Sequence, residues 1–126
     1  MTNQLCTTVL NQLRDQVLNL LDDLLCICPN EPDILLMRLF FENHVDPITL
    51  MNGFITWVYP WKEYIKDRNE YYFEENDHIF GPLPMDKVDY FKTKMVDGTF
   101  DSSDKKIIWD YFQVFISLVE QYNKIK

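Results

Sequence analysis

The sequence contains no alanine, three glycines and three cysteines, and it has no long run of uncharged apolar residues. With so few glycines and only six prolines, it shows no low-complexity or disordered tract. No stretch approaches the roughly 18 apolar residues of a membrane span, and the N-terminus lacks the basic flank and apolar run of a signal peptide. We therefore expect an intracellular protein without membrane insertion.

Residue patterns that would mark a metal or cofactor site are also missing from the sequence. Cys26 and Cys28 have no second cysteine pair or nearby histidine to complete a zinc site, and Cys6 makes the number odd. We expect buried or half-buried free thiols. There is no glycine-rich phosphate loop, HExxH pair or Gly-x-Ser-x-Gly elbow. The sequence thus predicts no cofactor, metal or catalytic residue, and a protein that is not an enzyme.

The two histidines each leave an alternative open. His44 lies two residues before Asp46, where a hydrogen-bonded structural role at a helix junction is the simpler interpretation and catalysis is the other. His78 lies among three acidic residues, which form either a solvated acidic loop or part of a metal site.

Acidic residues dominate the charge of the chain. The formal net charge of −8 argues against general affinity for nucleic-acid phosphates. Residues 1–60 carry seven acidic residues and two basic ones, Arg14 and Arg38. A nucleic-acid role would need a local basic patch, which could form if lysines of the second half converge in space. These lysines are Lys87, Lys92, Lys94, Lys105 and Lys106. We expect no direct nucleic-acid binding.

The C-terminal stretch, residues 101–126, has the broadest apolar surface of any expected helix. At about 100° per residue, its apolar side chains cover more than half of the circumference, so the helix needs neighbours on several sides. They are Ile107, Ile108, Trp109, Tyr111, Phe112, Val114, Phe115, Ile116, Leu118, Val119, Tyr122 and Ile125. Asp101, Ser102 and Ser103 are candidate N-caps. The 126-residue chain is therefore predicted to form one all-α domain, a compact bundle of five or six helices around this central helix.

Proline-containing turns separate the other expected helices. Residues 2–28 carry apolar residues at steps of three and four, from Leu5 to Ile27. Residues 33–43 are apolar on nearly every side, so this second helix is expected to be buried nearly all round. We expect a loop over 70–84 and a short helix over 85–95.

A third helix begins with Asp46 as its cap and Pro47 at its first position. It turns Ile48, Met51, Ile55 and Val58 inward. Pro60 should kink or break it before a charged helical piece at 62–68.

Leu18 and Leu25 lie off the main stripe of the first helix, seven residues apart. One interpretation is that a neighbouring helix of the same domain covers both. The other is a seam for a second copy or a partner.

Seven aromatic residues fall within the 17 positions from 57 to 73, beside the expected loop. Ordinary core packing is one explanation. The other is a partner-binding surface, because Trp and Tyr bury large areas with few rotatable bonds and dominate binding hot spots. The candidate partner-binding residues are Trp57, Tyr59, Trp61, Tyr64, Tyr71 and Tyr72.

Three short patterns lie between residues 41 and 112. They are Phe41-x-x-His44-x-x-Pro47, Leu83-Pro84 with the segment 88–91, and Lys105-x-x-Ile108-Trp109-x-Tyr111-Phe112. Over residues 41–119 the chain resembles a family of small, functionally uncharacterised proteins of large nucleocytoplasmic DNA viruses, except that Asp104 stands where the family pattern has Thr. The resemblance implies a viral origin and no particular activity. The missing alanine and abundant Asn, Lys, Ile, Phe and Tyr fit an AT-rich viral genome.

We therefore expect a non-enzymatic interaction protein or structural protein of a large DNA virus, acting in the virion, in assembly or in the host cytoplasm. Its expected partner is a viral or host protein, and a homo-oligomer is a further possibility. The alternative is a regulatory adaptor that binds a partner helix in a groove.

Overall fold

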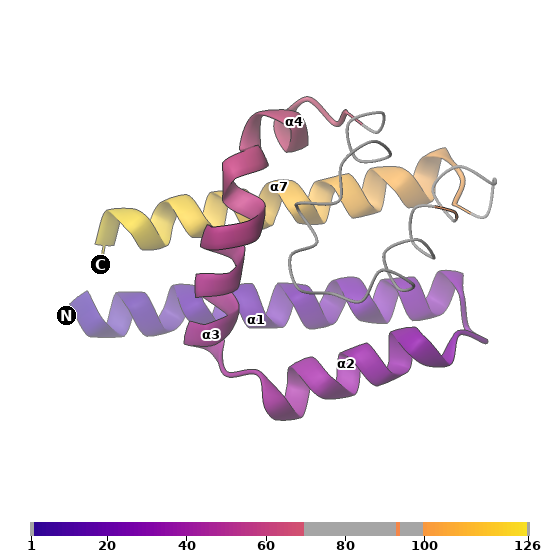
Figure 1. Ribbon diagram of the computed structural model, residues 1–126, viewed down its shortest axis with the longest axis horizontal. Helices are drawn as coiled ribbons and strands as arrows, with labels where there is room; N and C mark the ends of the chain where they lie inside the picture. Colours follow the sequence, from indigo (N-terminus) through magenta and orange to yellow (C-terminus); the bar gives the residue numbers. More distant parts are fainter. Residues whose placement is uncertain (1, 70–92, 94–99, 126) are drawn as a thin grey trace.

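A computed structural model describes residues 2–69, 93 and 100–125, and these ranges are built from helices without any strand (Figure 1). Helix α1 (Thr2–Ile27) is followed by α2 (Pro32–His44) and α3 (Pro47–Gly53). A π-helical turn (Phe54–Val58) and a 3-10 turn (Tyr59–Trp61) lead into α4 (Lys62–Lys66), and α7 (Ser102–Ile125) ends the chain. The all-α prediction is confirmed for this part of the chain.

The predicted number of helices is slightly too high for the described residues. The segments from α3 to α4 follow one another without interruption and form one bent rod (Figure 1). With α1, α2 and α7, the described residues therefore form four helical rods. The helix expected over 85–95 and the loop expected over 70–84 lie outside the described residues.

The core lies between α1 and α7, which run antiparallel and bring the two chain ends to the same side of the molecule (Figure 1). Leu13 of α1 and Val119 of α7 have no exposed surface, and Phe115 is buried beside them. Burying an aliphatic or aromatic side chain of this size contributes about 1.5–3 kcal/mol. The helical spacing of these residues in the sequence therefore corresponds to a real two-helix core.

The predicted central position of the C-terminal helix is shared with α1. Helix α1 contacts α7, α2 and α3, and it lies between α2 and α7 (Figure 1). On α1, Leu18 is buried and Leu25 packs against the core. The interpretation of these two leucines as a contact within the domain is thus supported, since little of Leu18 is left for a seam with another chain.

The start of α7 is fixed by two aspartates that cap each other. The backbone N–H of Asp104 donates to Asp101 Oδ1 at 2.9 Å, and the backbone N–H of Asp101 donates to Asp104 Oδ2 at 3.2 Å. This reciprocal arrangement is a capping box, which satisfies two backbone donors that a helix start leaves open. Of the three candidate caps, Asp101 is therefore the one used.

The rod from α3 to α4 crosses both long helices (Figure 1). Its start is the predicted one, with Pro47 at the first position and Asp46 Oδ1 accepting a hydrogen bond from the backbone N–H of Thr49 at 2.8 Å. That bond lowers the pKa of Asp46. Pro60 kinks the rod and does not break it, because the π-helical and 3-10 turns accommodate a residue that has no N–H to donate.

The end of α4 has an arginine where glycine is usual. Arg68 has a φ of 53°, and the backbone N–H groups of Arg68 and Asn69 donate to Ile65 and Tyr64 in a Schellman arrangement. Its guanidinium donates to Asp110 and, at 3.0 Å, to Gln113 Oε1, both on α7. These contacts offset the strain of a left-handed arginine and fasten the rod to α7.

We predict that Asp101→Ala lowers the free energy of unfolding by about 1 kcal/mol, because it removes the side-chain half of the capping box. Urea denaturation followed by circular dichroism measures this loss. Ser103→Ala in the same helical turn is the control and should change stability by less than about 0.5 kcal/mol. Equal losses in the two variants would contradict the assignment of the cap.

At the end of α4, Arg68→Gly and Arg68→Ala both remove the guanidinium contacts, but only alanine keeps the left-handed strain. We expect the alanine variant to be the less stable of the two by about 1 kcal/mol. The comparison needs thermal and urea unfolding of both proteins. A glycine variant no more stable than the alanine variant would mean that position 68 is not left-handed in solution.

Candidate protein-binding surfaces

Helix α2 is apolar on two opposite sides. Towards α1 it presents Ile34, which is 1% exposed, together with Met37 and Phe41, which pack against the core. Ile34 and Met37 are three residues apart and Phe41 follows four later, the spacing of one helix face. This side of α2 completes the core along the lower edge of α1 (Figure 1).

The opposite side of α2 carries four apolar side chains that face solvent. The exposed fractions are 48% for Leu35, 61% for Leu36, 42% for Leu39 and 53% for Phe40. Leu35 and Leu39 form one row at a spacing of four, and Leu36 and Phe40 form the next, so the four side chains adjoin. We call these four residues the α2 apolar surface. The prediction that this helix is buried nearly all round is wrong, because α1 covers one side and the other stays open.

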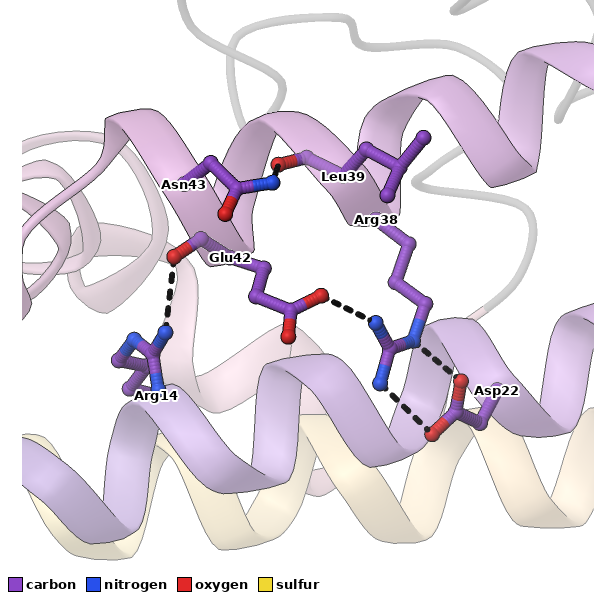
Figure 2. Close-up of polar contacts among 6 residues, drawn as sticks. All are labelled: Arg14, Asp22, Arg38, Leu39, Glu42 and Asn43. Atoms are coloured by element: carbon purple, nitrogen blue, oxygen red, sulfur yellow. Dashed lines mark hydrogen bonds and ion pairs between the residues drawn. The ribbon is translucent and has the colours of Figure 1, made fainter.

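Polar contacts fix how α2 is turned on α1 (Figure 2). Arg38 of α2 binds the carboxylate of Asp22 on α1 and, at 2.6 Å, Glu42 Oε2 one turn further along its own helix. Arg14 of α1 donates to the backbone carbonyl of Glu42 at 2.9 Å. Hydrogen bonding to Asp22 raises the pKa of Arg38 further above its ordinary range. These bonds hold the polar edge of α2 on α1 and leave the α2 apolar surface directed outwards.

The charge around α2 is negative. Residues 2–44 hold six acidic residues, two arginines and no lysine. Both arginines are used within the fold, Arg14 on the carbonyl of Glu42 and Arg38 between two carboxylates. On the edge of α2 that meets α1, the two carboxylates of Asp22 and Glu42 are matched by one guanidinium, so the local charge is negative.

An open depression of about 510 Å³ lies where α2 meets α3. It is lined by Arg14, Glu42, Asn43, His44, Val45, Asp46 and Pro47. His44 is the last residue of α2, is exposed, and has its ring 5.8 Å from that of Phe40. The imidazole thus lies at the helix junction, beside the end of the α2 apolar surface.

The aromatic cluster predicted from the sequence divides between core and surface. Tyr59 and Trp61 are partly buried and pack against the small cluster of Val58, Ile65 and Ile116. Trp57 is 43% exposed and Tyr64 is 39% exposed. Tyr71 and Tyr72 lie outside the described residues.

Tyr59 has a second role as a platform for Lys62. The ammonium of Lys62 lies 4.5 Å from the ring centre of Tyr59 and donates to its hydroxyl at 3.2 Å. This donation to Tyr59 raises the pKa of Lys62. Of the four candidate partner-binding residues that the structure describes, Trp57 and Tyr64 are the most exposed.

The described residues contain no group of three His, Cys, Asp or Glu side chains that could hold a metal ion. His78 and its acidic neighbours lie outside these residues. None of the three cysteines forms a disulfide, and Cys28 is buried and Cys6 half-buried. Cys26 is exposed, which corrects the expectation that every thiol is at least half-buried. Within the described ranges, none of the helices has the length and apolarity to cross a membrane.

Several side chains expected inside are exposed, and most lie away from the two-helix core. Besides the α2 apolar surface they are Leu5 of α1, Ile48 of α3, and Ile107 and Val114 of α7. These four are distributed over three helices and do not adjoin one another in sequence. The α2 apolar surface is thus the largest set of neighbouring exposed apolar side chains on any one described helix.

Comparisons with protein families, curated proteins and solved structures found no match for this chain.

Tyr111 provides a pH-sensitive link between the two long helices. Its hydroxyl donates to Asp23 Oδ2 of α1 at 2.6 Å. Partial burial, followed by this hydrogen bond and the charge of Asp23, raises the pKa of Tyr111 from 10.0 to about 12. Because folding raises this pKa, the protonated tyrosine stabilises the folded state. This stabilisation is complete below the pKa of the unfolded chain and is lost as the pH rises through the pKa of the folded protein.

We therefore predict that the wild-type protein loses stability between pH 10 and about pH 12 more steeply than Tyr111→Phe. Urea denaturation at a series of pH values measures this difference. The same slope in wild type and Tyr111→Phe would contradict the link.

Proposed function

We propose that this chain is a non-enzymatic protein-interaction or structural protein, and that it binds its partner through the α2 apolar surface. The observation that carries the proposal is the open apolar side of α2, with Leu36 and Phe40 both more than half exposed. Adjoining exposed apolar side chains cost free energy in water, and such patches commonly mark protein-binding sites. A partner that covers them recovers that free energy.

The support beneath this surface favours binding over local disorder. Ile34 on the opposite side of α2 is buried, and Arg38 holds the helix to Asp22 of α1. A partner would therefore meet a surface that is already ordered, and ordering costs at the interface would be small.

We also propose that the chain is a structural or assembly protein of a large DNA virus, acting in the virion or the host cytoplasm. This viral part of the proposal depends on the sequence resemblance alone. The residues of that resemblance that the structure describes have structural positions. Phe41 packs on the core, His44 ends α2, Pro47 begins α3, and Trp109 is buried in α7. They are consistent with a shared fold and carry no chemistry.

The second candidate is a host-directed or viral regulator that takes a partner helix in a groove. The depression between α2 and α3 is the feature that favours it, since it adjoins the α2 apolar surface at Phe40 and His44. Self-association through the same surface would instead give a homo-oligomer.

The proposal is tested by purifying the tagged protein gently from its native setting and identifying what accompanies it by mass spectrometry. We expect a viral or host protein to accompany the wild type and to be lost from the double variant Leu36→Gln, Phe40→Gln. Both side chains are exposed, so each substitution should change the free energy of unfolding by less than about 0.5 kcal/mol relative to wild type.

Two control variants separate the candidate surfaces. Val114→Gln replaces an exposed aliphatic residue of α7 and should retain the partner. Trp57→Ala tests the aromatic cluster. Loss of the partner with Trp57→Ala and retention with the α2 double variant would assign binding to the aromatic cluster and contradict our choice of surface. Recovery of the wild-type protein alone would contradict the interaction proposal.

A further inference from the structure

We infer that the partner of the α2 apolar surface is a basic amphipathic helix, which packs along α2 on the side opposite α1. This inference rests on the proposed function and adds the chemistry of the partner. It follows from the shape of the surface, from the charge around it and from the comparison with other possible occupants.

The shape of the surface suits a helix. The pairs Leu35 with Leu39 and Leu36 with Phe40 are two parallel rows at a spacing of four. Helices pack by placing such a row of side chains in the groove between the rows of another helix. Helix α2 has 13 residues, so a partner helix of about three to four turns would run along about 20 Å of it.

The charge near the surface selects a basic partner. Asp22 and Glu42 share the guanidinium of Arg38, so two carboxylates are matched by one cation there. Residues 2–44 hold six acidic residues and two arginines, so this part of the chain carries a net negative charge. Lysine or arginine residues beside the apolar stripe of a partner would gain from this field, whereas acidic residues would be repelled.

The C-terminal end of α2 offers a place for one such basic side chain. Glu42 and Asp46 line the depression there, and the last carbonyl groups of a helix carry partial negative charge. Arg14 also lines the depression and keeps its positive charge while it donates to the carbonyl of Glu42, so the two carboxylates there exceed the guanidinium by one charge. The depression adjoins Phe40 through His44, so one partner helix could reach both.

Two other occupants fit the charge less well. A second copy of the chain would bring one acidic surface against another, in a protein of net charge −8. An anionic membrane would repel the same acidic residues, whereas helices that lie on membranes usually carry basic ones. The basic helix is the occupant that the apolar rows and the charge favour together.

The test uses the full chain and a fluorescent peptide of 18 residues, made of leucine and lysine with leucine at helical spacing. A second peptide has glutamate at every lysine position, and a third has the first composition in an order without helical periodicity. Fluorescence anisotropy gives the dissociation constants for the wild type, for the double variant Leu36→Gln, Phe40→Gln, and for Val114→Gln.

We expect the leucine–lysine peptide to bind wild type and Val114→Gln alike, and to bind the double variant at least about tenfold more weakly. The glutamate peptide and the aperiodic peptide should each bind wild type at least about tenfold more weakly than the leucine–lysine peptide does. The double variant keeps every charge, so its loss of binding separates docking on α2 from general attraction between opposite charges.

Four results would overturn the inference. They are equal binding to wild type and double variant, equal binding of the lysine and glutamate peptides, a wild-type dimer in light scattering that the double variant lacks, and binding to phosphatidylserine vesicles that depends on Leu36 and Phe40. None of them removes the proposed function by itself. A natural partner that is lost from the double variant, with no preference for the basic peptide, would retain the binding surface and reject the chemistry assigned to its partner.

Discussion

The antiparallel contact between α1 and α7 is the interaction on which the rest of the structure depends. Leu13 and Val119 are excluded from water at this contact, and Phe115 extends it towards the ring of Phe54 in the crossing rod, 5.0 Å away. The hydrogen bond from Tyr111 to Asp23 adds a polar link at its edge. The two long helices form the core together. The remaining helices therefore pack against this core with one side each.

Helix α2 shows the consequence of this arrangement most clearly. Its inner side is used on α1, and the ion pair between Arg38 and Asp22 of α1 favours this orientation, in which the outer side stays exposed. Natural folds rarely keep adjoining leucine and phenylalanine side chains in water without a use for them. The outer side of α2 is thus the part of the described molecule where apolar side chains remain in water, and a partner that covers them would gain free energy.

The sequence predicted the helices well because their signals are local. Asp46 and Pro47 begin α3, and Asp101 caps α7, through hydrogen bonds that span three residues. The depth of burial was harder to predict for a helix with apolar residues all round. Nothing in the local pattern of 33–43 says which side lacks a neighbour, because that depends on where α1, α3 and α7 lie. The acidic bias of the first 60 residues could have indicated that Leu36 and Phe40 lie in a solvated region.

The candidate site was predicted in part. The excess of aromatic residues between 57 and 73 is real, but the bent rod uses Tyr59 and Trp61 for packing, and Trp57 and Tyr64 remain as exposed rings. The sequence gives the number of aromatic residues but not whether each ring lies in the core or at the surface. The outer side of α2 is bare in the free protein. Methyl NMR with a soluble paramagnetic agent tests it directly, because relaxation rises with solvent contact: Leu36 and Leu39 should relax far faster than Leu13, and equal relaxation of the three would show that α2 is covered.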